Sequence, residues 1–332
     1  SPAITVGGAV ATINVSIAGT AGLNKTGAGR LNLNAANAYS GITTVTAGIL
    51  GLAGATFSST SPLVISAAGA SVESTGTLNF SVNSTATTIA VTGSGTLRLV
   101  ATTNGPTSPD LYFGPNHSGN SYWGARLAAA LDLGGQQRYI FGKTGHDGIG
   151  VYGLTNADCQ FGGTIVGSGG LTFIAQNNWT GSGPMETGFA LNASNAFSGP
   201  VEIQRGSVYL GNASAFTRTN VLTFNPATGN NARLFLYGNN AVVADLSSPG
   251  DGAAAIANGN LASGAAFSVG PVTLTVQQNN DTVFGGAITD TLLEYAGSCS
   301  GTTGPLNLAK RGPASLRLTG ANSYSGTTTI SG

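Results

Sequence analysis

The chain has 332 residues, and its 12 basic and 12 acidic side chains cancel to leave no net charge at neutral pH. Charged residues make up only 7% of the sequence, whereas a typical soluble domain has about 25%. So few cations cannot neutralise a phosphate backbone, which argues against nucleic acid as a partner, and no run approaches the roughly 18 apolar residues of a membrane span.

The residue types predict an all-β chain. Gly accounts for 52 residues, and Gly, Asn, Ser, Thr, Val and Ile together are typical of short strands joined by tight turns. The sequence begins at Ser1-Pro2 without the basic segment of a secretory signal, which is typical of a mature product or a fragment. Sparse charge, two Cys residues and many uncharged polar side chains predict an extracellular location.

The first strand signals lie in residues 1–8, and a longer unit follows in residues 17–52. Leu31 and Leu33 alternate with polar residues, so both should face the same side of a short strand. Val45 is expected to do the same in the next strand. The unit is therefore a strand, a corner and a second strand.

Three residues between these strands predict the shape of the corner. Asn37 is expected to bond the backbone of its own turn. Tyr39 should cap the corner with its ring, and Gly41 should supply the positive φ of a sharp bend. Gly48 ends the second strand.

Short alternating strands continue in residues 76–80 and 95–99. The only stretch rich in helix-forming residues runs from Trp123 to Leu133, and Gly134-Gly135 directly after it argue against a helix.

Residues 104–150 are predicted to form a loop or decorated insertion, because both histidines of the chain and many aromatic and charged side chains gather there. If this segment contacts a glycan, Tyr112, Tyr122 and Trp123 are the expected platforms for sugar rings. The alternatives are a plain surface loop or the active face of a polysaccharide-degrading enzyme. No pair of carboxylates stands at a spacing that selects a mechanism, so we predict no catalytic residue, no metal site and no cofactor.

Two further copies of the first unit lie in residues 161–211 and 284–332. One unit cannot bury its apolar face alone, whereas stacked units bury a continuous core. The repetition therefore predicts a single parallel β-solenoid over residues 1–332, decorated by loops. Coils of about 20–25 residues would give roughly 13–16 coils.

The pattern from Lys25 to Val45 reads Lys-Thr-Gly-x-Gly-x-Leu-x-Leu-x-x-x-Asn-x-Tyr-Ser-Gly-x-Thr-Thr-Val. It resembles the autotransporter-associated β-strand repeat; residues 310–332 match it closely and residues 161–211 moderately. The resemblance implies a right-handed parallel β-helix in the passenger of a bacterial surface protein. It implies no catalytic residue.

The last copy stops at Gly332, before the strand that follows Gly48 in the first copy. Two explanations stay open: a chain cut within a longer protein, or a head-to-tail homopolymer in which the N-terminal strand of one subunit completes the last coil of another. The assembly residues of the second hypothesis are Ser1, Pro2, Ala3, Ile4, Thr5, Val6, Thr327, Thr328, Thr329 and Ile330.

Cys159 and Cys299 are separated by about six coils, or roughly 30 Å, and a disulfide needs Cα atoms within about 7 Å. Buried thiols or a bond between neighbouring subunits are therefore expected.

The sequence as a whole predicts a non-catalytic extracellular structural protein, a β-solenoid subunit of a surface fibre or an autotransporter-like passenger. The alternatives are an adhesin or glycan-binding module, and a β-helical polysaccharide-degrading enzyme. The predicted partners are other copies of the chain and surface glycans, without membrane insertion.

Overall fold

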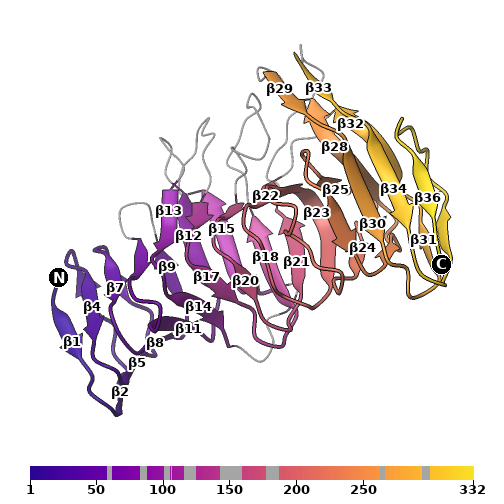
Figure 1. The fold of residues 1–332 in the computed structure, drawn as a ribbon. Coiled ribbons are helices and arrows are strands. Elements are labelled where there is room, and N and C mark those ends of the chain that lie inside the picture. Colours follow the sequence, from indigo (N-terminus) through magenta and orange to yellow (C-terminus); the bar gives the residue numbers. More distant parts are fainter. Residues whose placement is uncertain are drawn as a thin grey trace.

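The computed structural model shows a rod of stacked coils with the N- and C-termini at opposite ends (Figure 1). The structure describes all residues except 58–61, 83–87, 101–104, 106, 116–124, 143–158, 177–186, 262–265 and 294–299. Strands of successive coils pair in parallel, as β1 (Ala3–Thr5) does with β4 (Leu23–Thr26) and β4 with β7 (Thr43–Val45). The predicted parallel β-solenoid is confirmed.

Each coil contributes in turn to three faces of the rod. The first face is a continuous parallel ladder made by β1, β4, β7, β10 (Leu63–Ile65), β13 (Thr88–Thr92), β16 (Ala125–Leu127), β19 (Cys159–Phe161), β22 (Gly188–Leu191), the end of β23 (Val201–Leu210), β25 (Asn231–Phe235), β28 (Ala253–Leu261) and β32 (Ala287–Leu293).

The second face follows the first in each coil. It comprises β2 (Val10–Ile13), β5 (Arg30–Leu33), β8 (Ile49–Leu52), β11 (Ser71–Ser74), β14 (Thr96–Leu99), β17 (Ala130–Asp132) and β20 (Ile165–Val166), and later β26 (Ala241–Val243), β30 (Val272–Val276), β34 (Leu306–Lys310) and β36 (Thr328–Ile330).

The third face completes each coil. It comprises β3 (Ala18–Gly19), β6 (Ala38–Tyr39), β9 (Ala55–Phe57), β12 (Leu78–Val82), β15 (Leu111–Pro115), β18 (Arg138–Gly142), β21 (Leu171–Ala175), the start of β23, β24 (Leu222–Phe224), β27 (Leu246–Ser247), β31 (Thr282–Phe284) and β35 (Leu316–Leu318). Two further paired strands, β29 (Ala266–Val269) and β33 (Ser300–Thr303), project from the C-terminal half (Figure 1).

The coils vary in length more than the sequence predicts. Leu23 is in register with Thr43, 20 residues later, whereas Thr88 is in register with Ala125, 37 residues later. The first face has 12 strands in the described part of the chain, and β36 belongs to a further, partial coil that passes β32 without forming a first-face strand, as Ser323 N bonds Ile288 O there. The described coils therefore number 13, at the lower end of the 13–16 expected. The long coil keeps its parallel pairing, although the register between β13 and β16 shifts between Ile89 and Val91.

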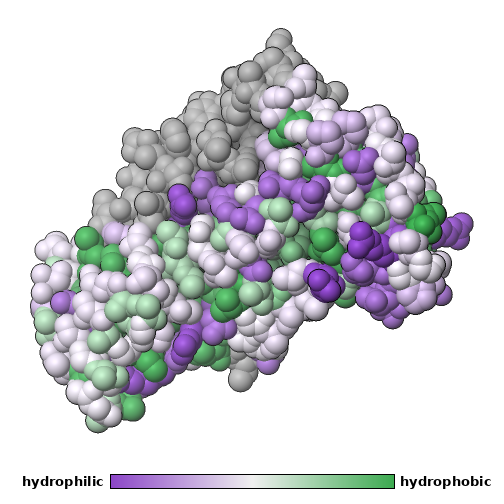
Figure 2. Space-filling model, in the orientation of Figure 1, coloured by the Kyte–Doolittle hydropathy of each residue, from purple (hydrophilic) through white to green (hydrophobic). Residues whose placement is uncertain are grey.

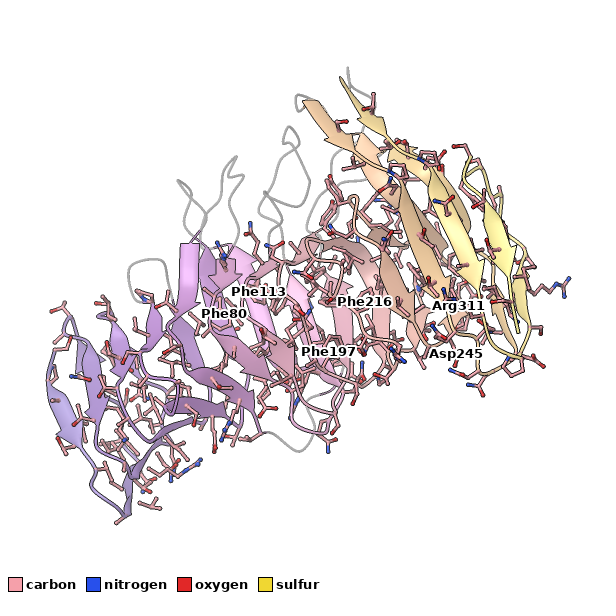
Figure 3. The ribbon with its side chains drawn as sticks, in the orientation of Figure 1. Phe80, Phe113, Phe197, Phe216, Asp245 and Arg311 are labelled. Atoms are coloured by element: carbon pink, nitrogen blue, oxygen red, sulfur yellow. The ribbon has the colours of Figure 1, made fainter. Side chains whose placement is uncertain are left out.

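Apolar side chains from all three faces fill the interior. Leu31, Leu33 and Val45 are fully buried, as their alternation predicts. A ladder of phenylalanines runs along the axis, with ring centroids 5.2 Å apart for Phe80 and Phe113, which Figure 3 labels in the N-terminal half. The ladder continues through Phe161, Phe173 and Phe189 at spacings of 5.7, 6.4 and 5.0 Å. Such contacts stabilise neighbouring coils against each other beyond the burial of apolar area.

The central segment contributes strands to the rod. The described part of the stretch from Trp123 to Leu133 forms β16 and β17, in agreement with the glycine argument against a helix. The segment 104–150, predicted to hold an insertion, contributes β15 to β18, and its residues 116–124 and 143–150 lie outside the described ranges.

Candidate functional site: repeat corners and the solenoid surface

The three repeat copies share a corner in which one asparagine joins two coils. In each copy the asparagine Oδ1 accepts a hydrogen bond from a backbone N–H of the preceding coil, from Ile17 to Asn37 (3.0 Å), from Ile165 to Asn195 (2.9 Å) and from Ile288 to Asn322 (2.9 Å). Asn37 Nδ2 also donates to Ala35 O at 2.9 Å, which confirms the predicted bond within the turn. The bond between coils was not foreseen, because it requires knowing which residues the stacking brings together.

The aromatic residue of the corner packs against the core. The Tyr39 hydroxyl lies 2.8 Å from Thr43 Oγ1, and the Tyr324 hydroxyl lies 2.7 Å from Thr328 Oγ1. The second copy has Phe197 at this position, fully buried. Burial raises the pKa of Tyr39, and the hydrogen bond with Thr43 opposes that rise.

The prediction of a positive φ at Gly41 is wrong, because Gly41 is not among the glycines with left-handed backbone. The residue must be small for another reason. A Cβ at Gly41 would collide with the backbone of Ala21 and Gly22 in the coil below. Gly199 and Gly326 occupy the same place in the other copies and lie equally close to the backbone beneath them. The corner glycine therefore allows two coils to approach closely.

The three copies do not start on the same face of the rod. The alternating apolar pair of the first copy lies in β5 on the second face, that of the middle copy in β22 on the first face, and that of the last copy in β35 on the third face. The unit therefore specifies a strand, a corner and a strand, and any corner of the rod accommodates it.

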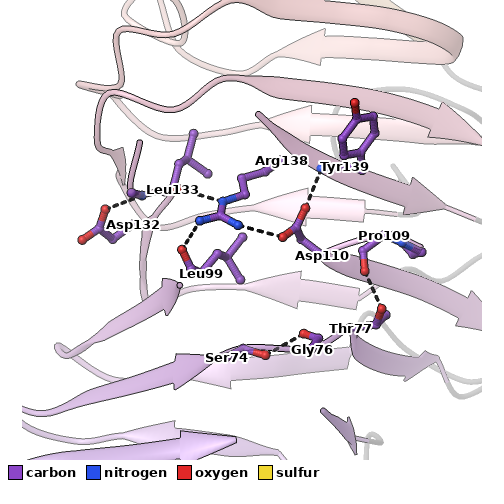
Figure 4. Close-up of polar contacts among 11 residues, drawn as sticks. Ser74, Gly76, Thr77, Leu99, Pro109, Asp110, Asp132, Leu133, Arg138 and Tyr139 are labelled. Carbon is purple, nitrogen blue, oxygen red and sulfur yellow. Dashed lines mark hydrogen bonds and ion pairs between the residues drawn. The ribbon is translucent and has the colours of Figure 1, made fainter. Parts of the chain in front are cut away.

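A buried ion pair ties two neighbouring coils together in the central segment (Figure 4). Arg138 Nη1 lies 3.0 Å from Asp110 Oδ1, and both side chains are about 2% exposed. The same guanidinium donates to the backbone oxygens of Leu133, at 2.8 Å, and of Leu99, while Asp110 Oδ2 accepts from Tyr139 N at 2.9 Å. Both side chains are buried and these contacts join strands of the rod, so this charged cluster supports the scaffold.

Of the predicted glycan platforms, the structure describes Tyr112 alone. Tyr112 lies in β15, half-buried, with its ring directly over Gly114. Burial raises the pKa of this phenol. Tyr122 and Trp123 lie outside the described residues, so the predicted platform stays a prediction.

The predicted assembly residues lie at opposite ends of the rod and do not meet within one chain (Figure 1). Of residues 1–6, Val6 is buried and bonds Thr26 O through its backbone at 3.0 Å, Ile4 is half-buried, and the others are exposed. Residues 327–330 are all exposed, and Ile330 is 72% exposed. β1 lies on the first face and β36 on the second.

The remaining candidate sites are quickly described. Cys159 is fully buried in β19, and Cys299 lies outside the described residues. Within the ranges that the structure describes, no three His, Cys, Asp or Glu side chains gather as metal ligands would. The same ranges hold no apolar helix long enough to cross a membrane.

The three faces, the parallel register and the asparagine corners define a parallel β-solenoid built from corner repeats. Residues 23–52 and 308–332 match the family of the passenger-associated transport repeat. The adhesin BmaC autotransporter of Brucella suis biovar 1 (strain 1330) is 33% identical over 194 residues, which cover 58% of this chain and 5% of that relative. No solved structure matches the chain. The chain therefore carries the β-repeats of an autotransporter passenger, which confirms the resemblance seen in the sequence.

Proposed function

We propose that this chain is a non-enzymatic segment of an adhesive passenger displayed at the bacterial surface. The observation that carries the proposal is the corner shared by the repeat copies, because the matched segments contain the asparagine bonds that join coil to coil. A stack joined in this way is a stiff spacer that holds its side surfaces away from the cell. The similarity to an autotransporter adhesin supports the same role.

The outer surface fits a spacer that faces solvent. Strongly hydrophilic residues are sparse on the N-terminal half of the face shown in Figure 2 and denser on the C-terminal half. With few charged side chains and no net charge, the chain has no strong overall electrostatic field, so contacts with partners would be made by local features.

The test is surface labelling and adhesion of the bacteria that produce the natural protein. Antibodies raised against residues 1–332 should label intact cells, and their Fab fragments should reduce attachment to host cells or matrix, whereas Fab fragments against a cytoplasmic protein should not. Labelling that appears only after the cells are permeabilised would contradict the proposal.

End-on stacking of copies is a second candidate function. Thr43–Val45 in β7 and Thr328–Ile330 in β36 occupy the same place in the repeat unit, and β1 and β7 both pair with β4. The β1 strand of a second copy could therefore pair with β36 and begin the next coil. The second copy would then be rotated about the rod axis, so that its first face continues the second face of the first copy. Unpaired strand edges favour such additions.

Sedimentation and electron microscopy over a range of protein concentrations test this second function. Filaments or end-to-end dimers should form in the intact chain and disappear when residues 1–8 are deleted. Circular dichroism would verify that the deleted protein is folded. A chain that stays monomeric at all concentrations would exclude end-on stacking.

A further inference from the structure

A polar groove opens on the second face where that face lacks regular strands. Between β20 and β26 the coils continue through residues 194–197 and 213–218, which bond to neighbouring coils without forming strands, as Ala196 N does with Ile165 O at 2.8 Å. The resulting cavity has a volume of about 610 Å³. Its floor includes Phe216, which is 4% exposed, and its polar lining includes Ser214, Thr217, Arg218, Thr275, Gln277 and Arg311.

Two arginines stand at this groove without a partner among the described residues. Neither Arg218 nor Arg311 has a side-chain hydrogen bond or ion pair there, and no carboxylate lines the cavity. Elsewhere on the same face Arg30 and Arg98 both pair with Glu73, at 2.5 and 3.8 Å. The two arginines of the groove are therefore an excess of positive charge on a chain whose net charge is zero.

The backbone holds both arginines in fixed turns. Asn220 is fully buried, accepts from Thr217 N at 2.6 Å and donates to Gly199 O at 2.8 Å, which fixes the turn that carries Arg218. Arg311 N donates to Val276 O at 2.8 Å in the coil below. Three coils separate the two arginines, which places them about 14 Å apart along the axis at about 4.8 Å per coil.

The other charged side chains near the Arg311 end bond residues other than the two arginines. Asp245 is buried and its carboxylate accepts three hydrogen bonds from Asn279 and Asn280. Asp281 accepts from Ser315, and Lys310 donates to Gly312 O at 2.6 Å. None of these carboxylates lines the groove.

We propose that this groove binds an anionic polysaccharide, with Arg218 and Arg311 each contacting an acidic group along an extended sugar chain. Guanidinium groups match carboxylate and sulfate oxygens in a planar fork. The hydroxyls and amides between them both donate and accept, as sugar hydroxyls require. Acidic peptides are a poorer match, because peptides are held by strand edges or apolar pockets, and the apolar lining beyond Phe216 is limited to Ala213 and Val242.

This inference rests on the proposed adhesive function and names its ligand class. Calorimetry on the purified chain would test it with oligomers of polygalacturonate and dextran sulfate as the anionic probes, and with neutral dextran and poly-glutamate as comparisons. At least one anionic saccharide should bind and dextran should not. Arg218→Gln and Arg311→Gln should each weaken binding roughly fivefold or more, and the double variant should abolish it. Raising the salt concentration should weaken binding of the unaltered chain.

Arg317→Gln is the matched control, because Arg317 is an exposed arginine of β35 outside the groove. It should bind as the unaltered chain does. The assignment is overturned if no anionic saccharide binds, if Arg317→Gln weakens binding as much as the groove variants, or if poly-glutamate binds more tightly through the same arginines. If the saccharide assignment fails while the antibodies still label intact cells, the proposed adhesive function stands and only the ligand of the groove is excluded.

Discussion

At the scale of single residues, the corner asparagine acts as a clamp, because its side chain hydrogen-bonds the backbone of a neighbouring coil. Asn195 is the most enclosed of the three, at 7% exposure, and it bonds Ile165 N on one side and Ala215 O, at 3.0 Å, on the other. It therefore joins three successive coils through one side chain. Burying a backbone group without a partner costs free energy, so losing this clamp should destabilise the fold by more than the net energy of its hydrogen bonds.

Asn195→Ala should lower the free energy of unfolding by about 1–3 kcal/mol, because it leaves a buried N–H and a buried carbonyl unsatisfied. Urea unfolding followed by circular dichroism measures the change. Asn34→Ala is the control, because Asn34 is exposed and its side chain donates one hydrogen bond, to the Asn14 side chain at 2.9 Å. The control should change stability by less than about 0.5 kcal/mol. Equal losses in the two variants would contradict the clamp.

The buried ion pair predicts a second residue effect. Asp110→Ala leaves the Arg138 guanidinium buried without its carboxylate, and breaking a buried pair in this way typically costs about 3–5 kcal/mol. Thermal unfolding of Asp110→Ala and of the double variant Asp110→Leu/Arg138→Met separates charge from packing. The double variant should recover much of the loss, because it removes both charges. A double variant as unstable as the single one would assign the loss to packing.

Residue by residue, the sequence predicts what is local and misses what depends on stacking. The alternation of Leu31 and Leu33 correctly predicts their burial, and Asn37 was correctly expected to bond its own turn. The sequence predicts the wrong reason for a glycine at position 41, because the backbone that Gly41 contacts belongs to the previous coil, whose position the sequence does not reveal. The same holds for the second bond of Asn37.

At the scale of elements, the corner accepts either tyrosine or phenylalanine at its aromatic position, because the three copies of the repeat already differ there. Tyr39 and Tyr324 bond a threonine four residues later, whereas Phe197 fills the corner without a hydroxyl. Tyr39→Phe should therefore keep the fold and cost about 1 kcal/mol for the lost hydrogen bond.

The same variant should change how stability depends on alkaline pH. Burial raises the pKa of Tyr39 in the folded chain, while an unfolded tyrosine ionises near pH 10. The unfolded chain therefore loses its phenol proton first, so this contribution to stability is complete below about pH 10 and is lost as the pH rises toward the raised folded pKa. Melting temperatures from pH 8 to 11 should fall less steeply for Tyr39→Phe than for the unaltered chain. Identical slopes would contradict a buried phenol.

Element lengths were the least predictable feature. The unit of 20 residues recurs where coils are short, but the coil from β13 to β16 spans 37 residues, and no pattern in the sequence marks how long a corner insertion runs. Parallel pairing depends on the strands that stack, so the long coil keeps its pairing with only a local shift of register between Ile89 and Val91.

At the scale of the whole molecule, the repetition is enough to predict a parallel β-solenoid, because stacked units bury the apolar faces that single units cannot. The groove could not be predicted. Arg218 and Arg311 lie in different coils, and the sequence gives no coil boundaries between them that would place both on one face. The two arginines are far apart in the sequence, and only the register of the coils shows that they share a cavity.

Coil-on-coil stacking predicts that the rod can be shortened. In the first-face ladder each strand pairs with the coil before and the coil after it, so a fragment that ends at a coil boundary keeps nearly all the contacts of its remaining coils. Residues 1–211, which end just after β23, should therefore fold with the β-sheet circular dichroism per residue of the full chain and a lower melting temperature. Residues 1–196 lack β23, which covers both β21 and β22, and should melt lower still. If residues 1–211 were unfolded, the stability of the rod would have to come from contacts beyond neighbouring coils. Stacking of neighbouring coils could then not explain why the rod is stiff.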